Sequence, residues 1–267
     1  MADGIARLVR LAAGWCALAA RPRGERTLAL VLSNYQGRGG RTAFAVGLDG
    51  PASLVAIADD LRAAGFSIGE LPDAAALIRA LETGAAYVDV PLADYGVWFA
   101  TLPAEFRRAV RDRWGEPEED VAAVGAALRL RVLVAGRLIV AVQPDRGLAE
   151  ARATDHHDPA LPPPHAYVAF YLWLRRCAGI DAMIHLGTHG TLEWLPGKAV
   201  ALSPACPPAV LTDGLPVVYP FIVNNPGEAA QAKRRLGRRH GAAGEPSVEK
   251  RPLVPNEMAD LSERRPL

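Results

Sequence analysis

The stretch from Thr27 to Arg41, TLALVL followed by SNYQGRGGR, decides the fold class of the chain. TLALVL is a short apolar run between polar residues, which is typical of a buried β-strand. The nine residues after it are polar and rich in glycine, so they predict a loop at the carboxyl end of that strand. Pro51 and Ser53 then begin a helix with one apolar face, and Gly65 ends it. Strand, glycine-rich loop and helix in this order predict a mixed α/β body.

The segments further along the chain show the same alternation of patterns. Residues 128–142, LRLRVLVAGRLIVAV, hold two β-rich runs around Ala135-Gly136 and predict a hairpin. Residues 74–81 and 165–177 have the length and composition of helices. Residues 181–186, DAMIHL, predict a strand that runs directly into a glycine-rich turn.

The two ends of the chain differ in character. The apolar residues from Ile5 to Cys16 follow an i, i+3, i+4 rhythm, so residues 1–24 predict an amphipathic helix that Pro22 ends. This stretch is shorter than the roughly 20 apolar residues that span a bilayer, although Ala19-Ala20 would also fit a signal-peptide cleavage site. Residues 236–267 contain no aromatic residue, four prolines and three glycines, and predict a disordered tail.

Bulk composition narrows the class of protein. The chain has 267 residues, 50% of them apolar, and a net charge of +1, which suits a globular protein without a nucleic-acid or membrane footprint. Its three cysteines are widely spaced, so we expect a reducing compartment and a cytoplasmic location. We predict four segments: an N-terminal helix (1–24), an α/β domain with the glycine-rich loop (25–145), a site-bearing segment (146–235) and a disordered tail (236–267).

The densest polar group of residues is HLGTHGTLEWLPGK, residues 185–198. His185 and His189 have the spacing of a zincin helix, but Gly187 and Gly190 disfavour a helix and no glutamate follows the first histidine. A strand end followed by a tight loop fits better. Imidazole and carboxylate groups can bind a divalent metal or move a proton near neutral pH, so His185, His189 and Glu193 are candidate metal ligands and catalytic bases. The alternative is that the histidines only stabilise the loop.

Three other polar sets are candidates for ligand binding. His156, His157 and Asp158 stand together on a predicted loop. The glycine-rich loop carries amide and cationic groups that suit a carboxylate-rich ligand, namely Asn34, Tyr35, Arg38 and Arg41. Arg146, after Gln143-Pro144 at the end of the hairpin, can do the same. For each set the alternative is a loop that is simply solvated.

Nucleotide-binding motifs are missing from the sequence. Six residues separate Gly190 from Gly197 where a phosphate loop has four, and Ala199 stands where that loop has a hydroxyl. No GxGxxG opens a helix, and no GxSxG is present. The sequence therefore offers no visible means of hydrolysing ATP.

The motifs together resemble a known family. HLGTHGTLEWLPGK and NNPGEAAQAKRR (224–235) closely resemble the large CobN-type subunit of aerobic cobaltochelatase, and they are similar to the H subunit of magnesium chelatase. LSNYQGRGGR, AVQPDRG and HDPALPPPHAYVAFYLWLR match the family in the same order, so the resemblance covers roughly residues 5–235. Trp194 in EWLPGK favours the cobalt branch. Residues 236–267 do not resemble the family, whose chains are several times longer, so the sequence is expected to be a partial chain with a foreign tail.

The resemblance implies a function. The family's large subunit holds a tetrapyrrole, in the cobalt enzyme hydrogenobyrinic acid a,c-diamide, and Co²⁺ is the metal inserted. Two partner subunits, of the AAA+ ATPase and integrin-I-like types, use the ATP. Carried over to this chain, His185, His189 and Glu193 lie in the site-forming motif, and His157 and Asp158 match a second one.

Other functions stay open at this stage. The chain is alternatively a tetrapyrrole-binding or partner-binding module without catalytic activity, or part of a magnesium chelatase H-type subunit. A zinc hydrolase built on the two histidines and Glu193 is a third class. Tight ring binding without metal insertion would indicate the module, and one co-purifying zinc per chain would indicate the hydrolase.

Overall fold

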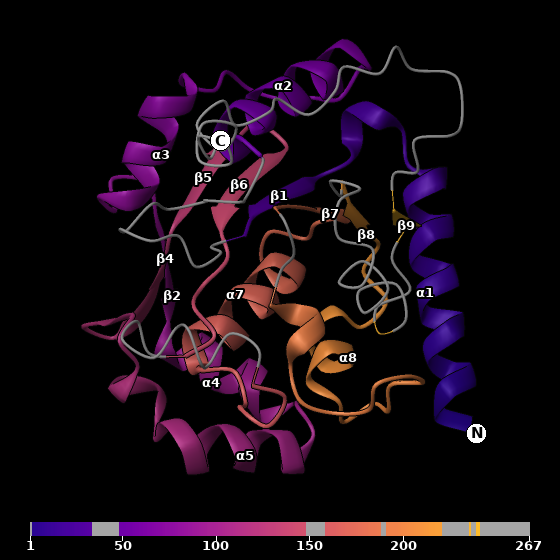
Figure 1. Cartoon of the computed structure of the whole chain (residues 1–267), viewed down its shortest axis with the longest axis vertical. Coiled ribbons are helices and arrows are strands. Elements are labelled where there is room, and N and C mark those ends of the chain that lie inside the picture. Colours follow the sequence, from indigo (N-terminus) through magenta and orange to yellow (C-terminus); the bar gives the residue numbers. More distant parts are fainter. Residues whose placement is uncertain are drawn as a thin grey trace, which may run out of the picture.

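The computed structural model of the chain describes residues 2–33, 48–147, 158–187, 191–220, 235 and 239–240. Helices surround two β-sheets (Figure 1). The larger sheet has the strand order β5-β6-β1-β7-β8-β9. Its strands are β1 (Leu28–Leu32), β5 (Val132–Ala135), β6 (Leu138–Val142), β7 (Ala182–Leu186), β8 (Val217–Tyr219) and β9 (Arg239–His240). The smaller sheet has the order β2-β4-β3, with β2 (Val88–Pro91), β3 (Ala123–Val124) and β4 (Ala127–Leu130).

Three parallel strands form the centre of the larger sheet. Leu32 at the end of β1 lies opposite Val142 of β6 and Leu186 of β7. All residues of β1 and β6 are buried, as expected for parallel strands that are covered on both faces. β5 pairs with β6 in antiparallel fashion, so the hairpin predicted at Ala135-Gly136 is confirmed.

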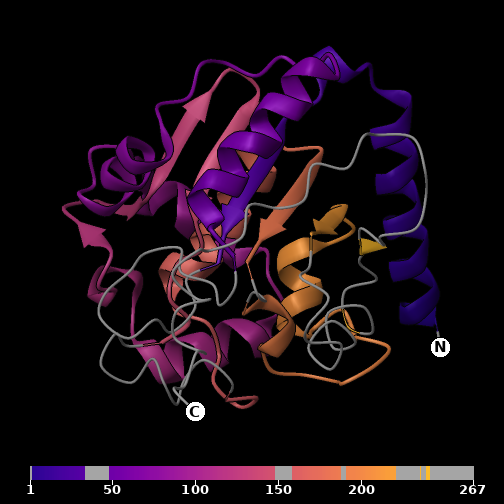
Figure 2. The same cartoon turned by 45° about the horizontal axis from the view of Figure 1, so that its top comes forward.

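Helices cover both faces of this sheet. Leu28 and Leu30 share a buried cluster with α2 (Gly50–Ala63) and α3 (Ala74–Glu82), which lie over one face (Figure 2). Ala29 and Val31, which point the other way, share a cluster with α7 (His165–Arg176). The mixed α/β class is therefore confirmed as three layers. The remaining helices are α1 (Ala2–Ala20), α4 (Leu92–Ala100), α5 (Ala104–Trp114), α8 (Pro207–Thr212) and the short 3-10 turns at Arg23–Glu25, Pro117–Glu119 and Leu192–Trp194.

Local sequence explains where the helices begin. The Asp49 carboxylate accepts a hydrogen bond from the backbone N–H of Ala52 at 2.9 Å, which caps α2. The Asp73 carboxylate caps α3 in the same way through the Ala76 N–H at 2.8 Å. α7 follows three prolines and is buried along nearly its whole length, because it lies between the two sheets.

The N-terminal helix forms as predicted but buries the opposite face. Ile5, Leu8 and Val9 of the predicted apolar face are 59%, 67% and 61% exposed. Arg7 is buried instead, and Gly14 lies so close to Gly214 that a side chain would collide with its backbone. The close approach of Gly14 to the Gly214 backbone and the hydrogen bond from Arg7 to the Arg235 carbonyl thus decide which side of α1 faces the rest of the protein. The spacing of its apolar residues does not. No described helix is long and apolar enough to cross a membrane.

Strand pairings connect the predicted segments with one another. The run 128–142 divides at Arg131, because β4 pairs with β2 in the smaller sheet. β7, from segment 146–235, pairs directly with β1, from segment 25–145, so these two segments share one core. In the tail predicted to be disordered, Arg239–His240 pair with Val218–Tyr219 of β8. A strand edge can recruit two residues of any composition through backbone hydrogen bonds, so composition does not reveal such a pairing.

Candidate functional site at the carboxyl ends of the parallel strands

The three segments that carry the predicted site residues leave the sheet side by side. Gln143 N–H donates to the carbonyl of Leu32 at 2.9 Å, and Ser33 N–H donates to the carbonyl of Leu186 at 2.9 Å. The chain therefore leaves β6, β1 and β7 at one edge of the sheet. In open α/β sheets, ligands bind outside the carboxyl ends of the strands.

His185 lies within β7, and its side chain is fully buried. It follows Met183 by two positions, so it points toward the α7 side of the sheet. Its Nδ1 lies 3.0 Å from Ser33 Oγ, and its ring stacks on Tyr219 with centroids 5.4 Å apart. The imidazole thus connects the end of β1 with β7 and β8, within the strand that the sequence predicted for residues 181–186.

Gln143 is the centre of a buried hydrogen-bond network at the same edge. Its Nε2 donates to the hydroxyls of Tyr167 at 3.0 Å and Tyr171 at 2.6 Å. Its Oε1 accepts from the N–H of Thr191 at 3.2 Å, and Thr191 Oγ1 lies 2.9 Å from the Tyr167 hydroxyl. Burial raises the pKa of Tyr167 well above its usual value, so this phenol keeps its proton. The network ties the end of β6 to α7 and to the segment that leads to Glu193.

Glu193 lies in the 3-10 turn Leu192–Trp194 and is fully buried. Its backbone carbonyl accepts a hydrogen bond from Arg235 at 2.5 Å. The Leu195 carbonyl accepts a second one from the same guanidinium nitrogen at 2.6 Å. The position of Glu193 therefore depends on a residue 42 positions further along the chain.

Arg146 and Asp158 are brought together, but through backbone atoms. Arg146 is 2% exposed, and its guanidinium donates to the carbonyls of Asp158 and Leu161, the latter at 3.0 Å. The Asp158 carboxylate accepts from the N–H of Ala160 at 2.8 Å. Arg146 donates these two hydrogen bonds to the segment before α7, and its predicted role in binding carboxylates of a ligand stays a prediction.

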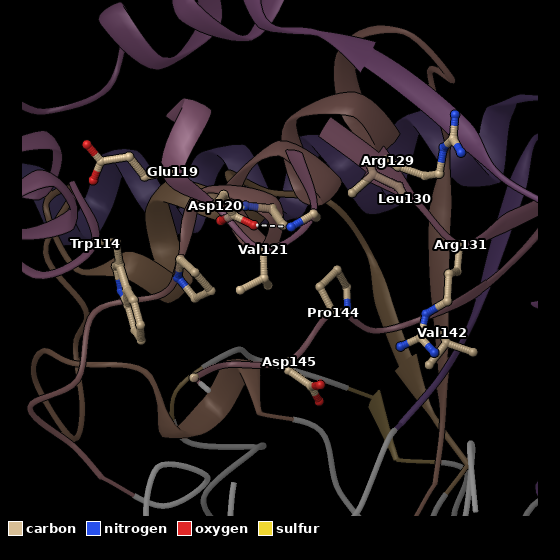
Figure 3. A pocket seen from close by; sticks show the side chains of 14 residues that line it. Trp114, Glu119, Asp120, Val121, Arg129, Leu130, Arg131, Val142, Pro144 and Asp145 are labelled. Atoms are coloured by element: carbon tan, nitrogen blue, oxygen red, sulfur yellow. Dashed lines mark hydrogen bonds between the residues drawn. The ribbon is translucent and has the colours of Figure 1, made fainter. Parts of the chain in front are cut away.

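A cavity of about 450 Å³ opens beside this edge, next to the carboxyl end of β6. Figure 3 shows Trp114 and Arg131 on opposite sides of it, with Val121 and Pro144 between them. The cavity is lined by Trp114, Glu119, Asp120, Val121, Ala122, Arg129, Leu130, Arg131, Val142, Pro144, Asp145, Gly147, Pro164 and Ala166. Arg129 is paired with Asp89 at 2.8 Å, whereas Arg131 makes no recorded ion pair within the described part of the chain.

Sequence reasoning missed most of this lining. Trp114 reads as a packing residue, and Arg131 lies inside a run that predicts an unbroken hairpin strand. The only signal was the neighbouring motif AVQPDRG, which supplies Pro144, Asp145 and Gly147. Arg131 joins the cavity because the chain changes sheets between β4 and β5, and no periodicity in the sequence marks that point.

Comparison with known proteins identifies the family. The sequence profile described as CobN/Magnesium Chelatase matches residues 1–237. The chain belongs to the CobN/magnesium chelatase family. Similar curated proteins include aerobic cobaltochelatase subunit CobN of Pseudomonas aeruginosa, with 45% identity over 85% of this chain and 19% of the relative. CobN of a Sinorhizobium species shares 43% over 84% of this chain and 18% of the relative. The H subunit of the magnesium chelatase of Chlorobaculum parvum shares 32% over 86% of this chain and 19% of the relative.

A solved member of the family has the same fold. The catalytic subunit of cobaltochelatase from Mycobacterium tuberculosis superposes with a TM-score of 0.75 at 40% identity, covering 88% of this chain and 21% of that one. The chain thus spans about a fifth of the length of the CobN relatives that it matches.

Seven candidate site residues of this CobN/magnesium chelatase family chain lie outside the described residues, namely Asn34, Tyr35, Arg38, Arg41, His156, His157 and His189. Among the residues that the structure does describe, no group of three or more His, Cys, Asp or Glu is arranged to hold a metal ion. The set of His185, His189 and Glu193 therefore stays a prediction, since its middle member is not described.

Proposed function

We propose that this chain forms part of the tetrapyrrole-binding subunit of an ATP-dependent cobaltochelatase, which inserts Co²⁺ into hydrogenobyrinic acid a,c-diamide in cobalamin biosynthesis. The convergence of the three family motifs at one edge of the sheet supports this most directly. Ser33, Gln143 and Gly187 begin three loops that leave adjacent parallel strands there. The higher identity to CobN proteins, 45% against 32% for the magnesium chelatase relative, favours cobalt as the metal.

The cavity beside β6 suits the ring. A volume of about 450 Å³ lies within the roughly 300–1,000 Å³ of small-molecule sites. A tetrapyrrole is a flat apolar ring with carboxylate or amide groups on its rim. Trp114 offers an aromatic wall for the ring, and Arg131 offers a guanidinium for a rim carboxylate. Residues 34–47 and 188–190 follow Ser33 and Gly187 in the sequence, so they are candidates to complete the site.

Metal insertion requires that two pyrrole protons leave the ring and that the metal loses bound water. Neutral imidazole and carboxylate groups can accept such protons and can also bind a divalent metal. We assign this work to His189 and Glu193, and because Glu193 is fully buried, its carboxyl group also has to become accessible. His185 is buried against Ser33 and Tyr219, which suits it to holding the end of β7. Its proposed direct role as ligand or base requires a movement of that strand end.

Energy for the reaction has to come from elsewhere in the complex. The sequence lacks a phosphate loop, so ATP hydrolysis is assigned to partner subunits of the AAA+ and integrin-I-like types. The rival proposal is a module that binds the ring without metallating it. The chain spans 19% of one CobN protein and 18% of another, so metal insertion is tested below in a full-length relative.

Ring binding by the chain tests the first part of the proposal. Hydrogenobyrinic acid a,c-diamide is titrated into the protein, and tryptophan fluorescence reports binding. Arg131→Gln should weaken binding about 10- to 100-fold, since a hydrogen bond to a charged group contributes about 1.5–3 kcal/mol. Arg137→Gln is the matched control, because Arg137 lies at the amino end of β6 and bonds Glu25 and Thr27 there. Equal affinity of both variants and the unmodified chain would exclude the cavity as the ring site.

Metal insertion is tested in a full-length relative that carries these residues. With both partner subunits, ATP, the ring and Co²⁺ present, the absorbance change of the ring reports metallation. Substitution of alanine at the position of His189 should abolish insertion and largely spare ring binding, because the lost contact acts in the transition state. Unchanged insertion would remove His189 from the mechanism, and faster insertion of Mg²⁺ than of Co²⁺ would reassign the branch.

A further inference from the structure

Arg235 holds the segment that carries Glu193 through four backbone carbonyls. Its guanidinium donates to the carbonyls of Glu193 at 2.5 Å, Leu195 at 2.6 Å, Lys198 at 3.1 Å and Pro196 at 3.2 Å. The side chain is 4% exposed. Guanidinium has five N–H donors in a rigid plane, so one side chain can satisfy a whole turn of backbone.

Arg235 is itself held in place by the N-terminal helix. The Arg7 guanidinium, 8% exposed, donates to the backbone carbonyl of Arg235 at 3.2 Å. Burial lowers the pKa of Arg235, while Cys206 and Glu193 raise it, and an arginine so far above neutral pH keeps its charge. A path of hydrogen bonds therefore runs from α1 through Arg235 to residues 193–198.

We propose that Arg235 is a positioning residue that fixes residues 193–198 and thereby the Glu193 carboxyl group. The inference rests on the proposed function only where it assigns Glu193 to ring metallation. A neutral or shorter side chain cannot replace it. Lysine has one nitrogen at the end of a flexible chain and cannot reach four carbonyls at once. A misplacement of about 1 Å in a catalytic group can cost about 100-fold in rate.

Cys206 provides a reporter for the same segment. A side chain at Gly197 would lie 2.7 Å from Cys206 Sγ, so the turn at residue 197 is packed directly against the thiol. Cys206 Sγ accepts the Lys198 N–H at 3.5 Å and lies 3.2 Å from Ser203 Oγ. Burial raises the pKa of this thiol, but the hydrogen bonds from Ser203 and Lys198 and the charge of Arg235 outweigh burial and lower it.

The test compares Arg235→Met and Arg235→Lys with Arg175→Met. Arg175 is a matched control, because it is also largely buried and donates to the carbonyls of Val210 and Leu211 at 3.1 and 3.2 Å. All variants carry Cys16→Ser and Cys177→Ser, which leave Cys206 as the single thiol of the chain. Two quantities are measured: amide hydrogen exchange in residues 193–198 and the pH profile of Cys206 alkylation.

Arg235→Met should raise exchange in residues 193–198 at least tenfold and move the alkylation profile to higher pH. Arg235→Lys should raise exchange too, but it keeps a positive charge near Cys206 and should shift the profile less. Arg175→Met should lower the thermal midpoint without affecting either quantity. Equal exchange in Arg235→Met and Arg175→Met would overturn the proposal, because the effect would then be general loss of stability.

A metallation assay distinguishes a failure of the positioning role of Arg235 from a failure of the proposed role of Glu193. In a full-length relative that carries these residues, lysine at the position of Arg235 should lower kcat and leave ring affinity unchanged. If hydrogen exchange behaves as expected but neither this variant nor glutamine at the position of Glu193 affects metallation, Arg235 positions the loop and the proposed role of Glu193 is wrong. If exchange does not respond, the positioning role is wrong whatever the metallation result.

Discussion

Gly187→Ala should strongly destabilise the chain at the end of β7. A Cβ at this position would lie 2.5 Å from Ser33 Cβ and 2.6 Å from Ser33 Oγ. Ser33 cannot move aside freely, since its N–H bonds the Leu186 carbonyl and its hydroxyl bonds His185. Gly187 also has a φ of +156°, where side chains are disfavoured.

The size of the effect follows from these two causes. Overpacking of a core position costs about 1–3 kcal/mol, and a backbone conformation that favours glycine costs about 1–3 kcal/mol. Together they predict a loss of about 2–6 kcal/mol in the free energy of unfolding. For a chain of this size 1 kcal/mol shifts the thermal midpoint by about 2–4 °C, so the midpoint should fall by about 4–24 °C.

A double-mutant cycle with Ser33→Gly isolates the collision. Ser33→Gly alone should cost about 1–2 kcal/mol, because it removes the hydrogen bond to His185 and adds backbone freedom. In the double variant the collision is absent. Its loss in the free energy of unfolding should therefore be about 1–3 kcal/mol smaller than the sum of the losses in the two single variants. Urea unfolding followed by circular dichroism measures all four proteins. Additivity within about 0.5 kcal/mol would refute the reasoning, since the close approach to Ser33 would then not be the reason for glycine.

Two further predictions concern buried polar groups. Burial lowers the pKa of His165 below its usual 6.5, and His165 Nε2 donates to the Gly115 carbonyl while Nδ1 accepts from the Tyr95 hydroxyl. Below pH 6.5 the unfolded chain therefore binds a proton at His165 that the folded chain does not bind. The free energy of unfolding should be highest above pH 6.5 and fall as the pH is lowered. In urea unfolding at several pH values, His165→Gln should reduce this pH dependence. Gln143→Leu should cost about 2–6 kcal/mol, because the buried Thr191 N–H loses its acceptor, at about 1–3 kcal/mol, and the Tyr167 and Tyr171 hydroxyls each lose one hydrogen bond, at about 0.5–1.5 kcal/mol; a loss below about 0.5 kcal/mol would contradict the network.

The sequence predicts the central strands and their loops well, because each signal there is local. The run 27–32 is apolar on both faces, and such runs occur in parallel strands covered by helices. The order of strand, loop and helix then fixes the edge at which the loops emerge. The starts of α2 and α3 each depend on one capping side chain, Asp49 and Asp73, so they too can be predicted from the sequence.

Other features depend on contacts between distant residues and leave no local signal. Arg146 is predicted from the sequence as a ligand-binding cation, and Arg235 carries no signal of its own. Both are buried, and backbone carbonyls accept hydrogen bonds from their guanidinium groups. His185 is correctly predicted within the strand at residues 181–186, but the complete burial of its side chain depends on Ser33 and Tyr219 and leaves no local signal. The rhythm of α1 predicts the wrong buried side, because close backbone approach at Gly14 outweighs the burial of a few apolar side chains.

At the carboxyl ends of β6, β1 and β7, some polar side chains stabilise the scaffold and others are available to a ligand. Gln143 and Arg235 direct the hydrogen bonds described above to backbone and tyrosine groups, and Arg146 bonds the carbonyl of Leu161. In the proposed function, ring recognition falls to groups that face the cavity, and Arg131 is a described cation in that position. A buried donor that bonds a carbonyl regains the hydrogen bond that it loses with water, so its burial costs little free energy. A cation that faces an open cavity is partly desolvated without such a partner, so keeping it there costs folding free energy. This asymmetry is why loss of Arg131 should weaken ring binding with little effect on unfolding, and loss of Gln143 should do the reverse.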